Sequence, residues 1–177
     1  TIGPLEYSSL IELFETVGRK YSDRIAFENM GMTLTFKQVD ELSTHFAAYL
    51  QNELGLKKGE RIAIQMPNLL QFPIAFIGSL KAGLIVVNTN PLYTPREMEH
   101  QFKDAEISAI VIVANFAHNL QTILGKIPAR HIIVTNMGDM LGTVKGTIVD
   151  FVVKHVKKMI PDYSLPKAIS FKSVLKK

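Results

Sequence analysis

The five residues Arg61-Ile62-Ala63-Ile64-Gln65 begin a series of short apolar runs that are rich in β-branched side chains. Three similar runs follow at 84–87, 109–113 and 132–134. Several of them lack the alternation of apolar and polar residues that a half-exposed strand shows. They therefore predict strands that are covered on both faces.

Helical stretches separate these runs, at about 70–82, 95–105 and 116–125. The resulting order β-α-β-α-β-α-β predicts an α/β fold, with a mostly parallel, doubly wound sheet, right-handed crossovers and flanking helices. Pro73 limits the first of these helices, because a start at Leu69 or Leu70 keeps the ring in the first turn, where it is tolerated, whereas an earlier start would not.

Capping boxes predict where three helices begin, because a Ser or Thr oxygen accepts from a backbone N–H and a side chain three residues later bonds back. The pairs are Ser9 with Glu12, Thr35 with Gln38, and Thr94 with Glu97. The first two pairs predict helices over about 10–21 and 36–54. Between these helices, Ile25-Ala26-Phe27-Glu28 and Leu34 predict a short antiparallel hairpin.

We expect residues 1–177 to form one α/β unit with three parts. These are N-terminal helices and a hairpin over 1–58, the βα core over 59–135, and a basic linker and helix over 136–177. The last helix is predicted from about Val144 to Ile160, where Pro161 closes it. One of its faces is apolar and contains Ile148, Val152, Val156 and Met159.

The composition fits a folded domain, since 47% of the 177 residues are hydrophobic and 20% are charged. The absence of cysteine excludes disulfides, a thiolate nucleophile and a cysteine-based zinc site. The apolar stretch 69–80 stops at Lys81, short of the ~18 residues that a membrane span needs. The first residues lack both an initiator Met and a signal-peptide pattern, so we expect the chain to begin inside a longer natural protein.

The basic excess lies at the end of the chain, where residues 136–177 carry eight lysines against Asp139, Asp150 and Asp162. These lysines cluster around one helix without arginine, which argues against nucleic acid as a partner. Two interpretations of the helix remain open. It could be an interfacial membrane anchor in which Lys154, Lys157 and Lys158 reach anionic head groups, or a helix that covers the domain with a solvated lysine face.

The sequence offers no candidate catalytic or metal-binding group. The five histidines, His45, His100, His118, His131 and His155, have no ligand spacing. His100 and Asp104 are four residues apart on a predicted helix and are interpreted as a surface pair. Gly78-Ser79 lies within an apolar helix and predicts close packing rather than a nucleophile elbow.

Three loops are candidates for ligand contacts. The segment Gly138–Thr147 is glycine-rich but lacks Gly-Lys-Ser/Thr and Gly-x-Gly-x-x-Gly, which favours a flexible linker. Met66-Pro67-Asn68 lies between a strand and a helix, where α/β proteins often bind ligands, but Asn68 or the next residue could simply cap the helix. The turn from Asn88 to Pro95 could face a cleft or be explained by side-chain turn bonds.

Longer runs of sequence resemble the N-terminal region of long-chain fatty-acid–CoA ligases, and less closely the wider acyl-adenylate-forming superfamily. The runs are Met66-Pro67-Asn68-Leu69-Leu70-Gln71-Phe72-Pro73, the stretch from Lys81-Ala82-Gly83 to Pro95-Arg96-Glu97, Ser108-Ala109-Ile110-Val111-Ile112-Val113, and Ile169-Ser170-Phe171. The resemblance covers nearly the whole chain but only about the first third of such an enzyme.

The resemblance implies a parent enzyme that activates a fatty acid with ATP and Mg²⁺ and then transfers the acyl group to CoA. The parts of the family that perform this chemistry lie after Lys177, so no catalytic, ATP-binding, CoA-binding or metal residue is assigned here. We expect the chain alone to be inactive, to self-associate, and to be cytoplasmic with a possible contact to the inner membrane face. The alternative is an autonomous lipid- or membrane-binding module without ligase chemistry.

Overall fold

Residues 6–176 are described by a computed structural model. Its strands are β1 (Ile25–Asn29), β2 (Met32–Thr35), β3 (Arg61–Gln65), β4 (Ile85–Asn88), β5 (Ile107–Val113), β6 (His131–Thr135) and β7 (Ala168–Ser170). Its α-helices are α1 (Leu10–Lys20), α2 (Phe36–Asn52), α3 (Gln71–Lys81), α4 (Pro95–Asp104), α5 (Ala117–Ile123), α6 (Thr143–Phe151) and α7 (Phe171–Val174). Short 3₁₀ turns flank α5, and a π-helical turn, Val152–Val156, continues α6.

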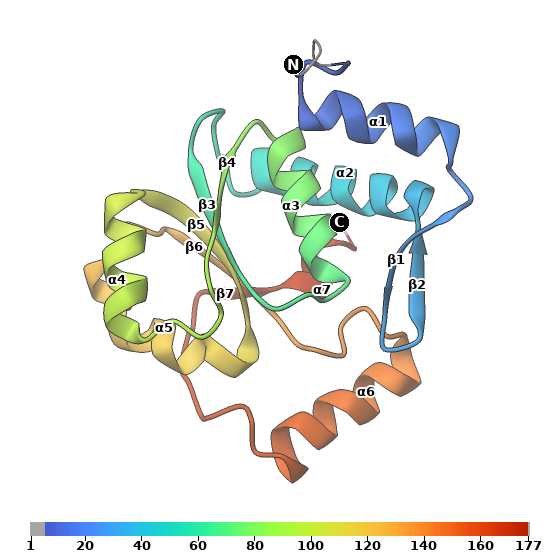
Figure 1. Ribbon diagram of the computed structural model, residues 1–177. Coiled ribbons are helices and arrows are strands. Elements are labelled where there is room, and N and C mark those ends of the chain that lie inside the picture. The colour runs from blue at the N-terminus through green and yellow to red at the C-terminus, as the bar shows by residue number, and fades with distance from the viewer. Residues whose placement is uncertain (1–5, 177) are drawn as a thin grey trace, which may run out of the picture.

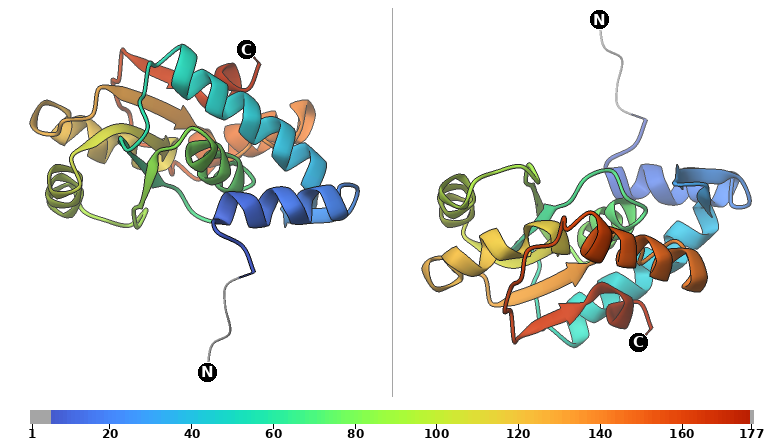
Figure 2. Two further views of the ribbon diagram at one scale, coloured as in Figure 1. Left: turned by 90° about the horizontal axis from the view of Figure 1, so that it is seen from above. Right: turned by 90° about the horizontal axis from the view of Figure 1, so that it is seen from below.

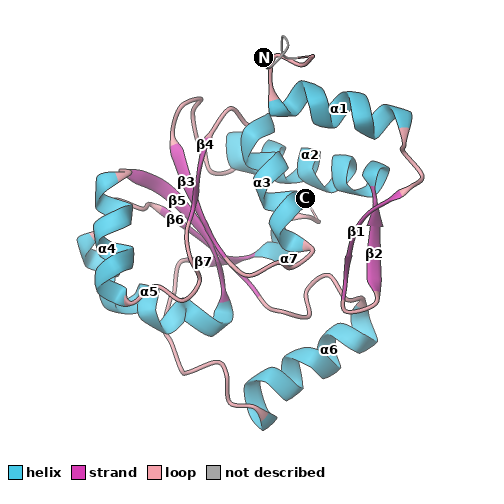
Figure 3. Cartoon of the chain, viewed as in Figure 1, coloured by secondary structure: helices cyan, strands magenta, loops and turns pink. Residues whose placement is uncertain are grey.

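Five strands form one parallel sheet in the order β4-β3-β5-β6-β7 (Figures 1 and 3). The predicted parallel α/β fold and the antiparallel hairpin, β1 with β2, are confirmed. The prediction missed β7, which pairs with β6 within the segment 136–177. That segment is therefore more than a linker and a helix.

Helices cover both faces of the sheet, which explains the apolar strands without alternation. On one face, Ile62 and Ile64 of β3 pack in a core with α2, α3 and α7, and α1 lies outside these helices. On the other face, Ile110 and Ile112 of β5 pack against α4 and α5. Figure 1 shows the two helix layers to the right and left of the sheet.

The helix starts follow the predicted caps with one difference. Thr35 and Thr94 form complete capping boxes with Gln38 and Glu97. At α1, Ser9 accepts from the Glu12 N–H as predicted, but the Glu12 carboxylate bonds to Ser8 instead of the Ser9 N–H. The first capping box is therefore only half formed.

The last helix shows the largest difference between the prediction and the structure. It ends as an α-helix at Phe151 instead of continuing to Ile160. Ile148, Phe151, Val156 and Met159 are exposed, whereas Val152 is half-buried and Val153 is buried. Most of this apolar face is therefore not covered by the described residues. In Figure 1, α6 lies at the lower edge of the molecule, apart from the sheet.

None of the helices formed by residues 6–176 has the length and unbroken hydropathy that crossing a bilayer requires.

Candidate functional site

Buried polar side chains gather where the parallel strands end. Of the eight polar or charged residues that are buried within residues 6–176, six lie at or just beyond the carboxyl ends of strands. These six are Gln65, Gln71, Thr89, Asn115, Thr135 and Asp139. Ligands of open α/β sheets bind at this edge. We therefore take the carboxyl edge of the sheet as the candidate functional site.

A hydrogen-bonded network links α3 to the end of β6. Gln71 Nε2 donates to Thr135 Oγ1 at 3.1 Å and to the Asn136 carbonyl at 2.8 Å. Thr135 Oγ1 in turn donates to Asp139 Oδ2 at 2.9 Å, and the Asn136 N–H donates to the same oxygen at 2.8 Å. The buried Asp139 carboxylate thus has two donors, which compensate its desolvation. The network fixes the loop that leads toward α6.

The strand order reverses between β3 and β5, and buried acceptors without partners lie beside this point. Gln65 ends β3, and its Nε2 donates to the Asn90 carbonyl at 3.3 Å. Asn115 follows β5, and its Nδ2 donates to the Met159 carbonyl at 3.2 Å. The side-chain oxygens of Gln65 and Asn115 have no hydrogen-bond partner among residues 6–176. Buried acceptors of this kind are usually paired, so these two oxygens are exceptions within the described residues.

The loop Met66-Pro67-Asn68 lies at the same edge, as its position between strand and helix predicts. Asn68 does not cap α3, nor does the residue after it. The N-cap is Leu70, which makes no side-chain capping bond, and Pro73 lies in the first turn. The Asn68 carbonyl accepts a bond from Asn29 Nδ2 at 3.1 Å, so the loop is tied to the β1–β2 hairpin. The capping interpretation of this loop is wrong.

Side-chain turn bonds do occur in the loop between β4 and α4. Asn90 Oδ1 accepts from the Leu92 N–H at 3.0 Å, and Thr94 caps α4. The same loop also takes part in the edge, because the Asn90 carbonyl accepts from Gln65 and the Asn88 carbonyl accepts from Gln101 Nε2. The side-chain turn bonds are therefore confirmed, and the loop lies at the carboxyl edge of the sheet.

The glycine-rich segment after β6 is not a linker. Gly138 packs against Gly146, α6 begins at Thr143, and Asp150 Oδ1 accepts from the Gly138 N–H at 2.7 Å. Partial burial raises the pKa of the Asp150 carboxyl; the bond from Gly138 opposes this rise and the nearby charge of Asp139 adds to it. Since the two glycines fill the space against each other, the segment offers no cradle for a phosphate.

Other candidates from the sequence stay outside the site. His100 is exposed and makes no hydrogen bond or ion pair with Asp104 in the described chain. Gly78 packs closely on α2, since a Cβ there would lie 2.7 Å from the Ser43 carbonyl, so the predicted close packing is confirmed. Within residues 6–176, no group of three His, Asp or Glu side chains could hold a metal ion.

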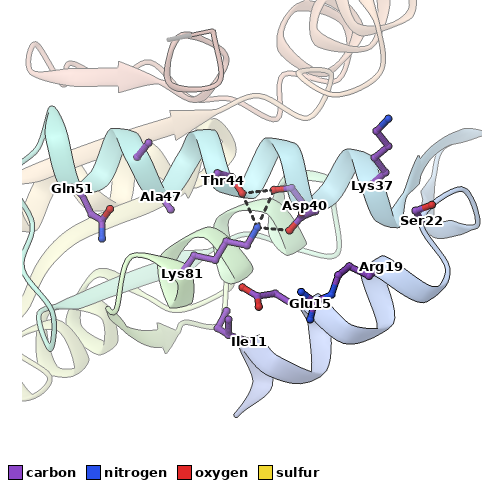
Figure 4. Close-up of a pocket in the computed structure, with 12 residues that line it drawn as sticks. Ile11, Glu15, Arg19, Ser22, Lys37, Asp40, Thr44, Ala47, Gln51 and Lys81 are labelled. Carbon is purple, nitrogen blue, oxygen red and sulfur yellow. Dashed lines mark hydrogen bonds and ion pairs between the residues drawn. The ribbon is translucent and has the colours of Figure 1, made fainter. Parts of the chain in front are cut away.

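A hollow of about 690 Å³ lies among α1, α2 and α3, and an ion pair lies in its wall (Figure 4). Lys81 Nζ lies 2.6 Å from Asp40 Oδ1 and also donates to Thr44 Oγ1 at 2.8 Å. These bonds satisfy the half-buried lysine from within the chain. We therefore interpret this hollow as a contact region between α2 and α3 and not as a ligand site.

A second hollow of about 380 Å³ is entirely apolar in character. It lies between α1, β1 and α3, and its walls include Leu13, Phe27 and Phe76. Leu10, Leu13 and Phe27 are exposed there. The sequence did not reveal this groove, because its walls come from three separate segments.

Comparison with known proteins identifies relatives of this chain. A family model described as AMP-binding enzyme matches residues 14–163. Long-chain-fatty-acid–CoA ligases of Salmonella typhimurium and Yersinia pestis are 57% and 58% identical to it over 98% and 99% of this chain. Among solved structures, an anthranilate–CoA ligase in complex with anthranoyl-AMP matches 98% of this chain with a TM-score of 0.76 at 19% identity, which supports the fold.

These matches cover nearly all of this chain but only part of each relative. The chain spans 31% of each of the two bacterial ligases and 29% of the anthranilate–CoA ligase.

Proposed function

Since this chain belongs to the family of AMP-binding enzymes, we propose that it forms the N-terminal part of a long-chain-fatty-acid–CoA ligase. The observation that supports this proposal best is the 57% identity to the Salmonella ligase across 98% of the chain. In the whole enzyme, the chain would form one wall of the substrate cleft.

The reaction of the whole enzyme would have two steps. A carboxylate is a poor electrophile, so the fatty acid first attacks the α-phosphate of ATP, forming an acyl-adenylate and releasing pyrophosphate. The thiol of CoA then attacks the acyl carbon, forming the thioester and releasing AMP. ATP, CoA and the fatty acid are thus the proposed substrates, and Mg²⁺ is the proposed metal.

We propose that this chain supplies the scaffold for those steps and that the groups that perform them lie in the remainder of the enzyme. No three metal-ligating side chains meet within residues 6–176, and the glycine-rich segment after β6 is closed by its own packing. A site of three protein ligands for Mg²⁺ is therefore absent from the described residues. The buried polar side chains at the carboxyl edge, such as Gln65 and Asn115, support the view that this edge faces a further part of the enzyme.

The proposal includes three properties of the parent protein. We expect a cytoplasmic location, self-association of the isolated chain through exposed apolar surface, and a peripheral contact with a membrane near Lys154, Lys157 and Lys158. A membrane contact suits the proposed substrate, because a long-chain fatty acid partitions into lipid.

A chimeric enzyme tests the proposal. The part of the Salmonella ligase that aligns with this chain is replaced by this chain, and palmitoyl-CoA is measured with palmitate, ATP and CoA. We expect activity from the chimera and none from the chain alone. The matched control is the chimera with Gly78→Leu, which cannot fit against Ser43 and should be inactive. A folded chimera without activity would contradict the proposal, as would acyl-AMP formation by the chain alone.

A further inference from the structure

We propose that the outer face of α6 and its π-helical turn is a docking surface for an anionic phospholipid bilayer. This outer face comprises five apolar residues and three lysines. Val144, Ile148 and Phe151 belong to α6, Lys154 and Val156 to the turn, and Lys157, Lys158 and Met159 follow it directly. The inference deepens the proposed membrane contact and rests on that part of the proposed function. It does not depend on ligase activity.

The apolar side chains of this face are uncovered. The five of them are between 53% and 75% exposed, although they belong to one short segment. The contacts of α6 within the described chain are mainly with the π-helical turn that continues it. The view from below in Figure 2 shows α6 in front, without another helix over it. Exposed apolar side chains gathered in one short segment indicate an interaction surface.

The inner side of the same segment is held in place. Gly146 touches Gly138, and Asp150 accepts the Gly138 N–H at 2.7 Å. Lys145 donates to the Met30 carbonyl in the hairpin, and the Met159 carbonyl accepts from Asn115 at 3.2 Å. These contacts attach the segment at both ends. The apolar residues are therefore presented outward by the fold itself, before any partner binds.

The positive charge of the outer face indicates an anionic partner. Asp150 is the sole acidic residue between positions 143 and 160, and it bonds inward to Gly138. Lys154, Lys157 and Lys158 are exposed, and none of them forms an ion pair or side-chain hydrogen bond within residues 6–176. An anionic lipid surface satisfies both the apolar residues and these cations. A symmetric contact with a second copy would instead bring like charges together.

A tryptophan reporter tests where the chain meets lipid. The sequence contains no tryptophan, so Phe151→Trp introduces a single fluorophore on the outer face. The matched control is Leu92→Trp, at a residue that is 76% exposed on the loop after β4. With vesicles of phosphatidylethanolamine and phosphatidylglycerol, we expect a blue shift of the emission for Phe151→Trp and none for Leu92→Trp. An unshifted Phe151→Trp signal in the presence of bound vesicles overturns the proposal.

Charge variants test the electrostatic part. Each lysine near an anionic surface should contribute about fivefold to the binding constant. Replacing Lys154, Lys157 and Lys158 together by Gln should therefore weaken co-sedimentation by about 100-fold. The matched control replaces Lys37, Lys57 and Lys58, which are exposed on other elements, and should change binding little. Circular dichroism of each variant verifies its fold.

Apolar variants and neutral lipid complete the experiment. Ile148→Ser with Phe151→Ser should abolish vesicle binding, and vesicles of phosphatidylcholine alone should bind the wild type weakly. Equal binding to both lipids, or equal loss in the two lysine triples, overturns the proposal. A third outcome also overturns it. If the serine variant sediments differently without lipid but binds vesicles as the wild type does, the outer face binds a second copy of the chain and not lipid. Loss of chimera activity with intact vesicle binding would affect only the proposed ligase function.

Discussion

Gly138 and Gly146 meet backbone to backbone, so closely that a Cβ atom added to either would lie 2.3 Å from the carbonyl oxygen of the other. The contact joins the loop after β6 to the first turns of α6. Because the two carbonyl oxygens belong to the backbone, neither can move away by a rotation about a side-chain bond. The position of α6 therefore depends on the absence of two side chains.

Gly146→Ala should destabilise the chain by about 1–3 kcal/mol, because overpacking forces the helix away from the loop. Its matched control is Gly18→Ala in α1, where an added Cβ would meet nothing within 4 Å. There the loss of glycine within a helix should stabilise by roughly 0.5–1 kcal/mol. Chemical denaturation of both variants measures the difference, and equal stabilities would contradict the close contact.

The sequence predicted the sheet well where strands are long and buried. The stretch at 109–113 is uninterrupted and became β5, which is covered on both faces. It failed at β7, because the three residues Ala168–Ser170 are too few to show a period and are strand only through pairing with β6. The extent of α6 was also overestimated, since an apolar period does not tell whether a protein surface or another medium covers it.

The candidate site was predicted only in its position. The end of a strand can be located in a sequence, and the loop after β3 was placed correctly. The bond between Gln71 and Thr135, however, joins residues 64 positions apart, and it exists because α3 crosses over the sheet toward the end of β6. The contact between Gly138 and Gly146 gave no signal either, since two glycines eight residues apart are equally typical of a loose linker.

Thr135→Val should destabilise the chain by about 1–3 kcal/mol, because Gln71 and the buried Asp139 each lose one hydrogen bond while the volume stays the same. The matched control is Thr122→Val, whose hydroxyl bonds to the Asn119 carbonyl on an exposed turn. That change should stay within about 0.5 kcal/mol. Denaturant unfolding measures the free energy of unfolding of both variants. If Thr135→Val is as stable as the control, the network does not contribute to stability and the prediction is wrong.

Asp150 and Glu97 should give opposite pH responses. Burial raises the pKa of Asp150, so its ionisation costs stability at neutral pH, and this cost disappears as the pH falls through the raised pKa. Asp150→Asn keeps an acceptor for the Gly138 N–H. It should therefore raise the melting temperature at neutral pH, with a gain that shrinks on acidification.

The pKa of Glu97 is lowered by its hydrogen bonds from Thr94, so the ionised carboxylate stabilises the chain above its unfolded pKa. This stabilisation is lost as the pH falls through the lowered pKa. Glu97→Gln should thus lower the melting temperature at neutral pH, by an amount that also shrinks on acidification. Thermal unfolding between about pH 3.5 and 7 measures both variants. Two changes of the same sign would refute the assignment.

The apolar groove between α1, β1 and α3 should cause the isolated chain to self-associate. Leu10, Leu13 and Phe27 are exposed along it, and its walls offer almost no polar surface for water to solvate. Sedimentation velocity should therefore show dimers or larger species as the concentration rises, and Leu13→Lys with Phe27→Lys should shift the chain back toward monomer.

The matched control for this association is Leu92→Lys, which adds the same charge at an exposed apolar residue outside the groove. If it dissolves the assemblies as well as the groove variant does, net charge and not the groove governs association. A monomer at every concentration would reject the prediction outright. Because the chain spans 31% of its bacterial relatives, the remainder of the enzyme could cover this groove. The same groove variants in the chimera test this. Charged residues should lower the stability of the chimera if the groove is covered, and should leave it unchanged if the groove is free.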